Sequence, residues 1–100
     1  MISRHWRGLA RLAEAGAYER HLLGPTLAEL EEIPGFIDVA LHRRRFKEGI
    51  QFLVITRWQS LEAITKFAGP DAEAAVVPAE VEAMMIEFDR RVEHFEVVET

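Results

Sequence analysis

The spacing of hydrophobic residues in this chain switches repeatedly between a period of two, typical of strands, and the longer period of helices. Strand spacing occurs at residues 2–12, 36–46, 50–58 and 90–99, and helical spacing occurs at residues 14–33 and 61–68. The near-continuous apolar run at residues 50–58 predicts a central strand. The chain therefore reads as strand, helix, strand, strand, helix, strand.

That order predicts an α+β fold of the ferredoxin-like, split βαβ type. Two right-handed crossovers then place both helices on one face of a four-stranded antiparallel sheet. A length of 100 residues fits a single domain over residues 1–100, near the lower limit for a self-sufficient core. The second face of the sheet would be bare in a monomer, so we expect a homodimer that buries this face.

Two signals mark how the helical segments begin and break. Gly24-Pro25 interrupts the first segment, because Pro25 has no N–H and disfavours the helical conformation of the residue before it. This dipeptide predicts a kink or a division into two helices. Ser60 is expected to cap the helix at residues 61–68.

Two further segments connect the predicted elements. Residues 47–49 predict a hairpin turn in which Gly49 supplies the positive φ. Residues 71–85 are rich in alanine and are broken by Pro78, which predicts one or two short helical turns. The final strand is then expected to begin near residue 90.

Composition excludes several classes of function. The net charge of -5 is spread along the chain without a basic stripe, so no nucleic-acid partner is expected. The absence of cysteine removes disulfides, thiolate nucleophiles and Cys-ligated metals. No run approaches about 18 apolar residues, and arginines stand where a signal peptide has its apolar core, so we expect no membrane partner and a cytoplasmic location.

The first strand divides its conspicuous residues between two faces. Alternation places Arg4, Trp6 and Gly8 on one face and His5 and Arg7 on the other. The missing side chain of the glycine leaves room beside the indole. We therefore expect the first group to face a cavity under the helices and the second group to face a partner subunit.

The segment FLVITRWQSLEAITKFAG, residues 52–69, resembles the antibiotic-biosynthesis-monooxygenase-like family of dimeric α/β-barrel proteins. Residues 4–8 and 92–98 resemble the first and last strands of that family, so the resemblance covers essentially the whole chain. The most specific matching residues are Thr56, Trp58, Ser60-Leu61-Glu62-Ala63 and Phe67-Ala68-Gly69.

The resemblance implies a cofactor-independent monooxygenase that acts on a small aromatic or quinone-type molecule and needs no metal. Quinone-forming members oxidise polycyclic phenols with molecular oxygen, which requires an apolar pocket, donors to a phenolate and the exclusion of water. His94 is the expected catalytic group, either handling a proton or orienting the substrate. The expected pocket residues are Arg4, Trp6, Tyr18, Trp58, Phe67 and Phe88.

A haem-degrading branch of the same family is disfavoured by the residues present. Its members use an asparagine, a tryptophan and an iron-ligating histidine at positions that fall here on Trp6, Phe67 and Val77. None of the three matches, and valine cannot ligate iron. Nor do His42 and His94 have a spacing that brings two metal ligands to one face.

Each candidate residue also has a purely structural interpretation. Trp58 ends an apolar strand and would pack sheet against helix, and His94 would be a hydrogen-bonded structural histidine. His5 is expected at the subunit interface, and His21 is expected in solvent. The alternative function is therefore a non-catalytic, small-molecule-binding or stress-associated dimer whose cavity is residual.

Overall fold

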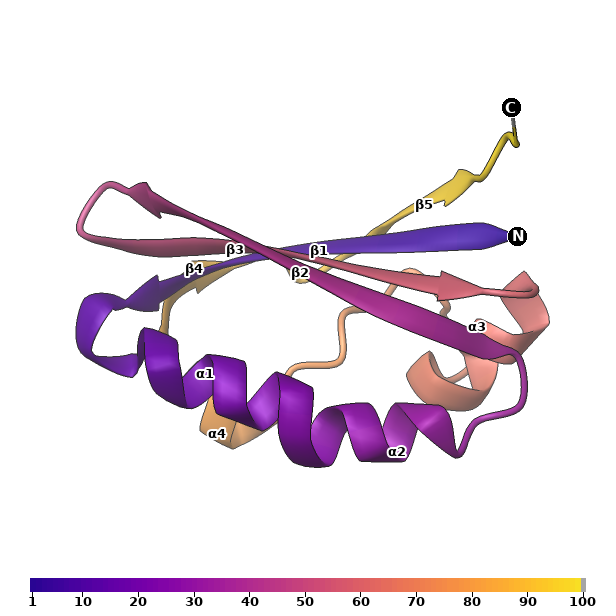
Figure 1. Ribbon diagram of the computed structural model, residues 1–100, viewed down its shortest axis with the longest axis horizontal. Coiled ribbons are helices and arrows are strands. Elements are labelled where there is room, and N and C mark those ends of the chain that lie inside the picture. Colours follow the sequence, from indigo (N-terminus) through magenta and orange to yellow (C-terminus); the bar gives the residue numbers. More distant parts are fainter. Residues whose placement is uncertain (100) are drawn as a thin grey trace.

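The computed structural model describes residues 1–99. Helices lie on one face of an antiparallel sheet (Figure 1). The elements are β1 (Ile2–Arg11), α1 (Ala15–His21), α2 (Leu27–Glu31), β2 (Phe36–Phe46), β3 (Gly49–Trp58), α3 (Leu61–Ala68), α4 (Ala79–Glu82), β4 (Met85–Phe88) and β5 (Glu93–Glu96). Within the described part of the chain, no helix is long and apolar enough to cross a bilayer.

The sheet confirms the predicted α+β, ferredoxin-like fold. Strands β2, β3 and β1 lie side by side, and β4 and β5 both pair with the remaining edge of β1. The two-stranded hairpin of β2 and β3 has the predicted bounds almost to the residue. Along β3, buried residues alternate with half-exposed ones, because helices cover one face of this central strand and leave the other face open.

The fourth strand position is divided, which the sequence did not predict. β4 pairs with residues 8–10 of β1, and β5 pairs with residues 2–5. The described residues thus form five strands instead of the expected four. Met85 was assigned to a helical segment, but it pairs with Ala10 of β1. The long-range bonds of the sheet edge override the helical preference of the alanine-rich segment, which keeps only the single turn α4.

The first helical segment is neither broken nor ended at Pro25. A π-helical turn at Leu22–Thr26 joins α1 to α2, and the amide of Leu27 donates to the carbonyl of Leu22, five residues earlier. This wider turn accommodates a residue that has no N–H to donate. The predicted interruption is therefore a local widening within one continuous helical path (Figure 1).

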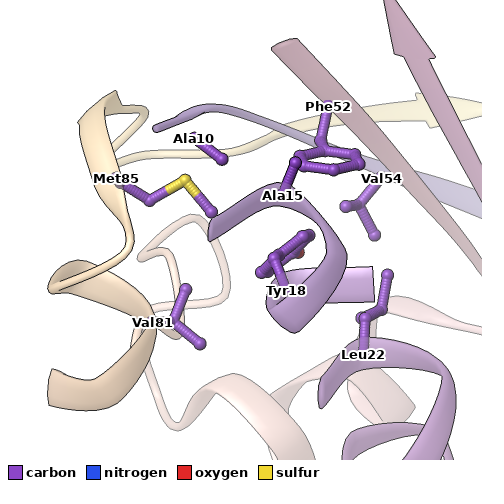
Figure 2. Packing of buried hydrophobic residues seen from close by; sticks show 8 residues of the cluster. All are labelled: Ala10, Ala15, Tyr18, Leu22, Phe52, Val54, Val81 and Met85. Carbon is purple, nitrogen blue, oxygen red and sulfur yellow. The ribbon is translucent and has the colours of Figure 1, made fainter. Parts of the chain in front are cut away.

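Two clusters of buried side chains hold the helices against the sheet. In the first cluster, shown in Figure 2, Tyr18 of α1 packs on Phe52 of β3 with ring centroids 4.9 Å apart. In the second cluster, Leu30 and Ile64 pack around Trp58, which is fully buried. Ser60 caps α3 as predicted, since its Oγ accepts the amide of Ala63 at 3.1 Å.

The prediction that Gly49 supplies the positive φ of the turn between β2 and β3 is wrong. The positive φ of 54° belongs to Lys47, and Gly49 is extended strand paired with Arg11. Gly49 is required for a different reason, because a Cβ atom there would lie 2.1 Å from the carbonyl oxygen of Ala10. The role of Gly49 is therefore to let two backbones approach closely, and not to adopt a turn conformation.

This close approach gives a stability prediction for two glycines. Gly49→Ala is expected to lower the free energy of unfolding by about 1–3 kcal/mol, because neighbouring backbone has to move. Gly16→Ala is the matched control, since a Cβ at that exposed position of α1 meets only the end of the flexible Arg20 side chain, at 3.3 Å. The control is expected to keep or slightly raise the stability. Urea unfolding checks both variants, and equal midpoints would contradict the backbone clash.

Candidate functional site

A cavity of about 80 Å³ lies between the sheet and the helices. We call it the inner cavity. Its floor comes from β1 and β3, and its cover comes from the helical path, α3 and the segment that follows α3. The lining residues are Arg4, Trp6, Val54, Thr56, Leu22, Thr26, Leu30, Phe67, Val76 and Val92. Most of these side chains are apolar, and the polar ones are Arg4, Thr26 and Thr56.

A second pocket of about 240 Å³ adjoins the inner cavity and is lined partly by exposed residues of the helical path and of the segment after α3. We call it the outer pocket. The two hollows share a neck made of Leu22, Thr26, Phe67 and Val76. The π-helical turn supplies two of these four residues, which agrees with the frequent use of such turns at functional sites. The arrangement forms a path from the surface to β1.

Arg4 is the charged group of the inner cavity, and it is only 4% exposed. Its Nη2 donates to the carbonyl of Ala74 at 2.8 Å, and its Nη1 donates to the carbonyl of Ala72 and to Nε2 of His94, the latter at 3.1 Å. The guanidinium also lies 5.7 Å from the ring centre of Phe67. Burial lowers the pKa of Arg4 to about 10, so the group still carries its charge at neutral pH.

His94 lies beside Arg4, opposite it in the pairing of β5 with β1. An arginine can only donate, so Nε2 of His94 accepts and the ring proton is on Nδ1. Burial, together with the positive charge of Arg4, lowers the pKa of His94. The imidazole is therefore neutral at neutral pH, and its free lone pair is engaged by Arg4. His94 touches Arg4 and is not among the residues that line either hollow in the described part of the chain.

Trp6 forms an immobile wall of the inner cavity. Its Nε1 donates to the carbonyl of Asp89 at 2.9 Å. Tyr18 and Phe88 flank the indole, with ring centroids 6.0 and 6.4 Å from it. A Cβ at Gly8 would lie 2.4 Å from the indole, so the glycine provides the space for the ring, as the sequence predicted. Tyr18 and Phe88 lie behind Trp6 and outside the lining.

Trp58 supports the opposite wall. It is fully buried, and its ring stacks on Phe67 with centroids 5.9 Å apart. Its Nε1 donates to Oγ1 of Thr56 at 2.8 Å. Because that oxygen acts as an acceptor, the hydroxyl proton of Thr56 is free to turn toward the cavity. Trp58 thus positions two lining residues without lining the cavity itself.

The two faces of β1 are occupied as alternation predicts. Arg4 and Trp6 line the inner cavity, whereas His5 bonds to Ser3 Oγ at 3.0 Å on the other side of the strand. On that side Arg7 forms an exposed ion pair of 3.1 Å with Glu93. His21 was expected in solvent, but its side chain is only 17% exposed, and it lies 3.8 Å from Glu80 at the outer pocket.

Several lining residues were not predicted from the sequence. Leu22, Thr26 and Val76 gave no separate signal, because their position depends on the π-helical turn and on the path of the segment after α3. Val54 and Thr56 share the helix-facing side of β3 with Trp58, and strand alternation could have identified them. Among residues 1–99, no group of three or more potential metal ligands lies together.

Comparisons with known proteins support the fold. No family model matches the chain, and no curated protein matches it. Among solved structures, a mutant of SnoaB, a cofactor-independent oxygenase from Streptomyces nogalater, aligns at TM-score 0.69 and 19% identity over 99% of this chain and 94% of that one. A putative antibiotic biosynthesis monooxygenase from Bacillus cereus aligns at TM-score 0.66 and 17% identity over 100% and 95%.

The haem degrader MhuD from Mycobacterium tuberculosis, with two haems in its active site, also aligns, at TM-score 0.60 and 22% identity over 98% of this chain and 97% of that one. At these identities the likeness concerns the backbone, and proteins with different chemistry share it. The resemblance read from residues 52–69 is thereby confirmed for the fold. The chain has the ferredoxin-like fold of the antibiotic biosynthesis monooxygenase-like proteins.

Proposed function

We propose that the chain is a cofactor-independent monooxygenase that acts on a small aromatic or quinone-type molecule in the inner cavity. The observation that carries the proposal is the composition of this cavity. It has two aromatic walls, Trp6 and Phe67, and one buried cation, Arg4, in an otherwise uncharged lining. The fold shared with SnoaB, a cofactor-independent oxygenase, supports the same reaction class.

The proposed reaction converts an activated CH₂ or CH group beside a phenol or ketone into a quinone carbonyl. Loss of a proton gives an enolate or phenolate, whose carbon donates electrons to O₂ and forms a C–O bond. The peroxide takes up a proton, and elimination of water then breaks the O–O bond. One oxygen atom of O₂ ends in the carbonyl and the other in water, so no external reductant is consumed.

The sizes of the two hollows require both of them to hold such a substrate. A dry cavity of about 150 Å³ is known to hold benzene, whereas the inner cavity measures only about 80 Å³. A bicyclic or tricyclic ring system therefore extends through the neck into the outer pocket of about 240 Å³. In this arrangement Phe67 belongs to both hollows and lies against the middle of the substrate.

A second candidate function is a non-catalytic, small-molecule-binding dimer. The observation that favours it is the lack of a general base at the inner cavity. Among the described lining residues, Arg4 is the sole titratable group, and the lone pair of His94 Nε2 is engaged by Arg4. A ligand that is not acidic would be bound and left unchanged.

Haem degradation stays disfavoured, although MhuD shares the fold. The positions that correspond to its functional residues carry Trp6, Phe67 and Val77. Val77 packs against the first core cluster and has no atom that ligates iron. The two aromatic residues belong to the inner cavity and leave it far smaller than a porphyrin requires.

We also propose that the open face of the sheet is the interface of a homodimer. Leu53 and Ile55 of β3 lie half-exposed on this face, and the neighbouring Phe95 of β5 is 50% exposed. Apolar side chains left on the open face of a sheet favour burial of that face against another surface. Burial of this face would also enclose His5, which packs on Phe95 with ring centroids 4.9 Å apart.

Oxygen uptake tests the proposed reaction. The purified protein is expected to accelerate O₂ consumption by a dihydroxynaphthalene or by anthrone, with the quinone as product. Trp6→Ala and Phe67→Ala are expected to lower kcat/KM by about 10²-fold, because the ring is no longer held in place. Leu61→Ala, at an exposed residue of α3 outside both hollows and away from the open face, is the control with little effect. If no phenolic substrate consumes oxygen above the background rate, the binding function replaces the enzymatic one.

His94 is proposed to orient Arg4 and not to carry a proton. His94→Gln keeps an acceptor for Arg4 and is expected to retain most of kcat/KM, whereas His94→Ala is expected to lower it about 10-fold. The pH profile of kcat/KM separates the two roles. A limb that is present in the wild-type protein and lost in His94→Gln would show that His94 transfers a proton.

Light scattering tests the dimer. The wild-type protein is expected at twice the monomer mass of 11.4 kDa at micromolar concentration. Ile55→Glu places a charge in the middle of the proposed interface and is expected to give the monomer. Leu61→Glu is the control, because this residue is 49% exposed on α3, away from the open face. A wild-type protein at monomer mass would contradict the interface.

A further inference from the structure

The buried guanidinium of Arg4 has no negative partner. No ion pair among the described residues includes Arg4. The groups around its guanidinium are two backbone carbonyls, the neutral ring of His94 and the face of Phe67. A charge held in an apolar interior is costly unless an opposite charge accompanies it. The arrangement leaves a place for an anion beside Arg4.

The hydrogen bonds of Arg4 leave donors for such an anion. A guanidinium has five N–H groups. Two on Nη1 are used by Ala72 and His94, and one on Nη2 is used by Ala74. Within residues 1–99, the Nε–H and the second Nη2–H have no acceptor. An Nε–H and an Nη2–H of a guanidinium can together bind a single oxyanion or a carboxylate.

Charges around the two hollows orient a ligand. The positive charge lies at the inner end, on Arg4, and the outer pocket carries Glu29 and Glu80 together with His21. An anionic group is repelled by the carboxylates at the outer pocket and attracted by the guanidinium at the inner end. The apolar part of the ligand then occupies the neck between them.

We propose that the inner cavity binds the ionised oxygen of an aromatic substrate, a phenolate or enolate, on the Nε and Nη2 groups of Arg4. The aromatic body lies between Trp6 and Phe67 and extends through the neck. This assignment rests on the proposed function for the kind of ring system, but the anion site itself does not require turnover. It makes Arg4 the residue that selects an ionised substrate over a neutral one.

A purely structural role for Arg4 predicts something different. In that case the guanidinium only holds the carbonyls of Ala72 and Ala74, and its removal would loosen the segment without any preference for charge in the ligand. An anion site instead favours the ionised form of a bound phenol. The pKa of a bound phenol therefore distinguishes the two roles.

The probe is 4-nitrophenol, whose phenolate absorbs in the visible range. On the wild-type protein, the bound phenol is expected to have a pKa lower than that of the free phenol by about one unit or more, which corresponds to at least about tenfold preference for the ionised form. The neutral analogue 4-nitroanisole is expected to bind at least tenfold more weakly than the phenolate. An unchanged or raised pKa overturns the proposal, as does the absence of binding at millimolar concentration.

Four variants test whether the shift is due to Arg4. Arg4→Met is expected to abolish it, and Arg4→Lys to keep part of it. Arg7→Met removes the same charge from the opposite face of β1 and is expected to leave the shift intact. The other titratable groups near the ligand are His94 beside Arg4, Glu73 near His94, and His21, Glu29 and Glu80 at the outer pocket. His94→Gln is expected to keep the shift, and a shift that survives Arg4→Met overturns the assignment.

The outcome is separable from that of oxygen uptake. Phenolate binding with a lowered pKa and no oxygen consumption leaves the anion site valid and removes the oxygenase function. Oxygen consumption that is unaffected by Arg4→Met leaves the oxygenase function valid and removes the anion site. The pKa of the phenol bound to the wild-type protein is measured without any variant. This measurement can therefore contradict the proposal even if Arg4→Met fails to fold.

Discussion

The break in the sheet edge at residues 89–92 is the constraint on which the candidate site depends. In place of a continuous fourth strand, the amide of Val92 donates to the carbonyl of Glu73 at 2.8 Å, and the amide of Ala75 donates to the carbonyl of Arg90 at 3.0 Å. These bonds draw residues 72–75 toward β1. The same bonds bring the adjoining residues Val76 and Val92 into the lining of the inner cavity.

Two arginines hold this segment, and they do so unequally. Arg91 pairs with Asp71 at 3.0 Å and with Glu73 at 3.3 Å, but these pairs are exposed and contribute little to stability. Arg4 bonds to the carbonyls of the segment from inside, where a charge-assisted hydrogen bond is worth more. The same guanidinium holds this segment with two N–H groups, bonds to His94 with a third, and has two others that are proposed to bind an anion, so the segment and the proposed anion site depend on one residue.

Local sequence patterns predicted the features that depend only on residues close together in the chain. Alternation within β1 separated Arg4 and Trp6 from His5 and Arg7, and Ser60 was identified by its place before an apolar helical stretch. The division of the fourth strand could not be predicted in this way, because β4 depends on pairing with residues 75 positions or more away in the chain. The neck residues were missed for a similar reason, since the π-helical turn and the segment after α3 meet only in three dimensions.

The geometry around His94 bears on which group could remove the substrate proton in the proposed reaction. A neutral imidazole whose lone pair accepts from Arg4 is a poor base, and the described lining of the inner cavity offers no other. Removal of the substrate proton then depends on the acidity of the substrate, which a buried cation increases by stabilising the anion. Carbanion chemistry with O₂ needs this anion and a dry cavity more than it needs a protein base. In the proposed reaction, the buried and uncompensated charge of Arg4 would restrict turnover to substrates that ionise readily.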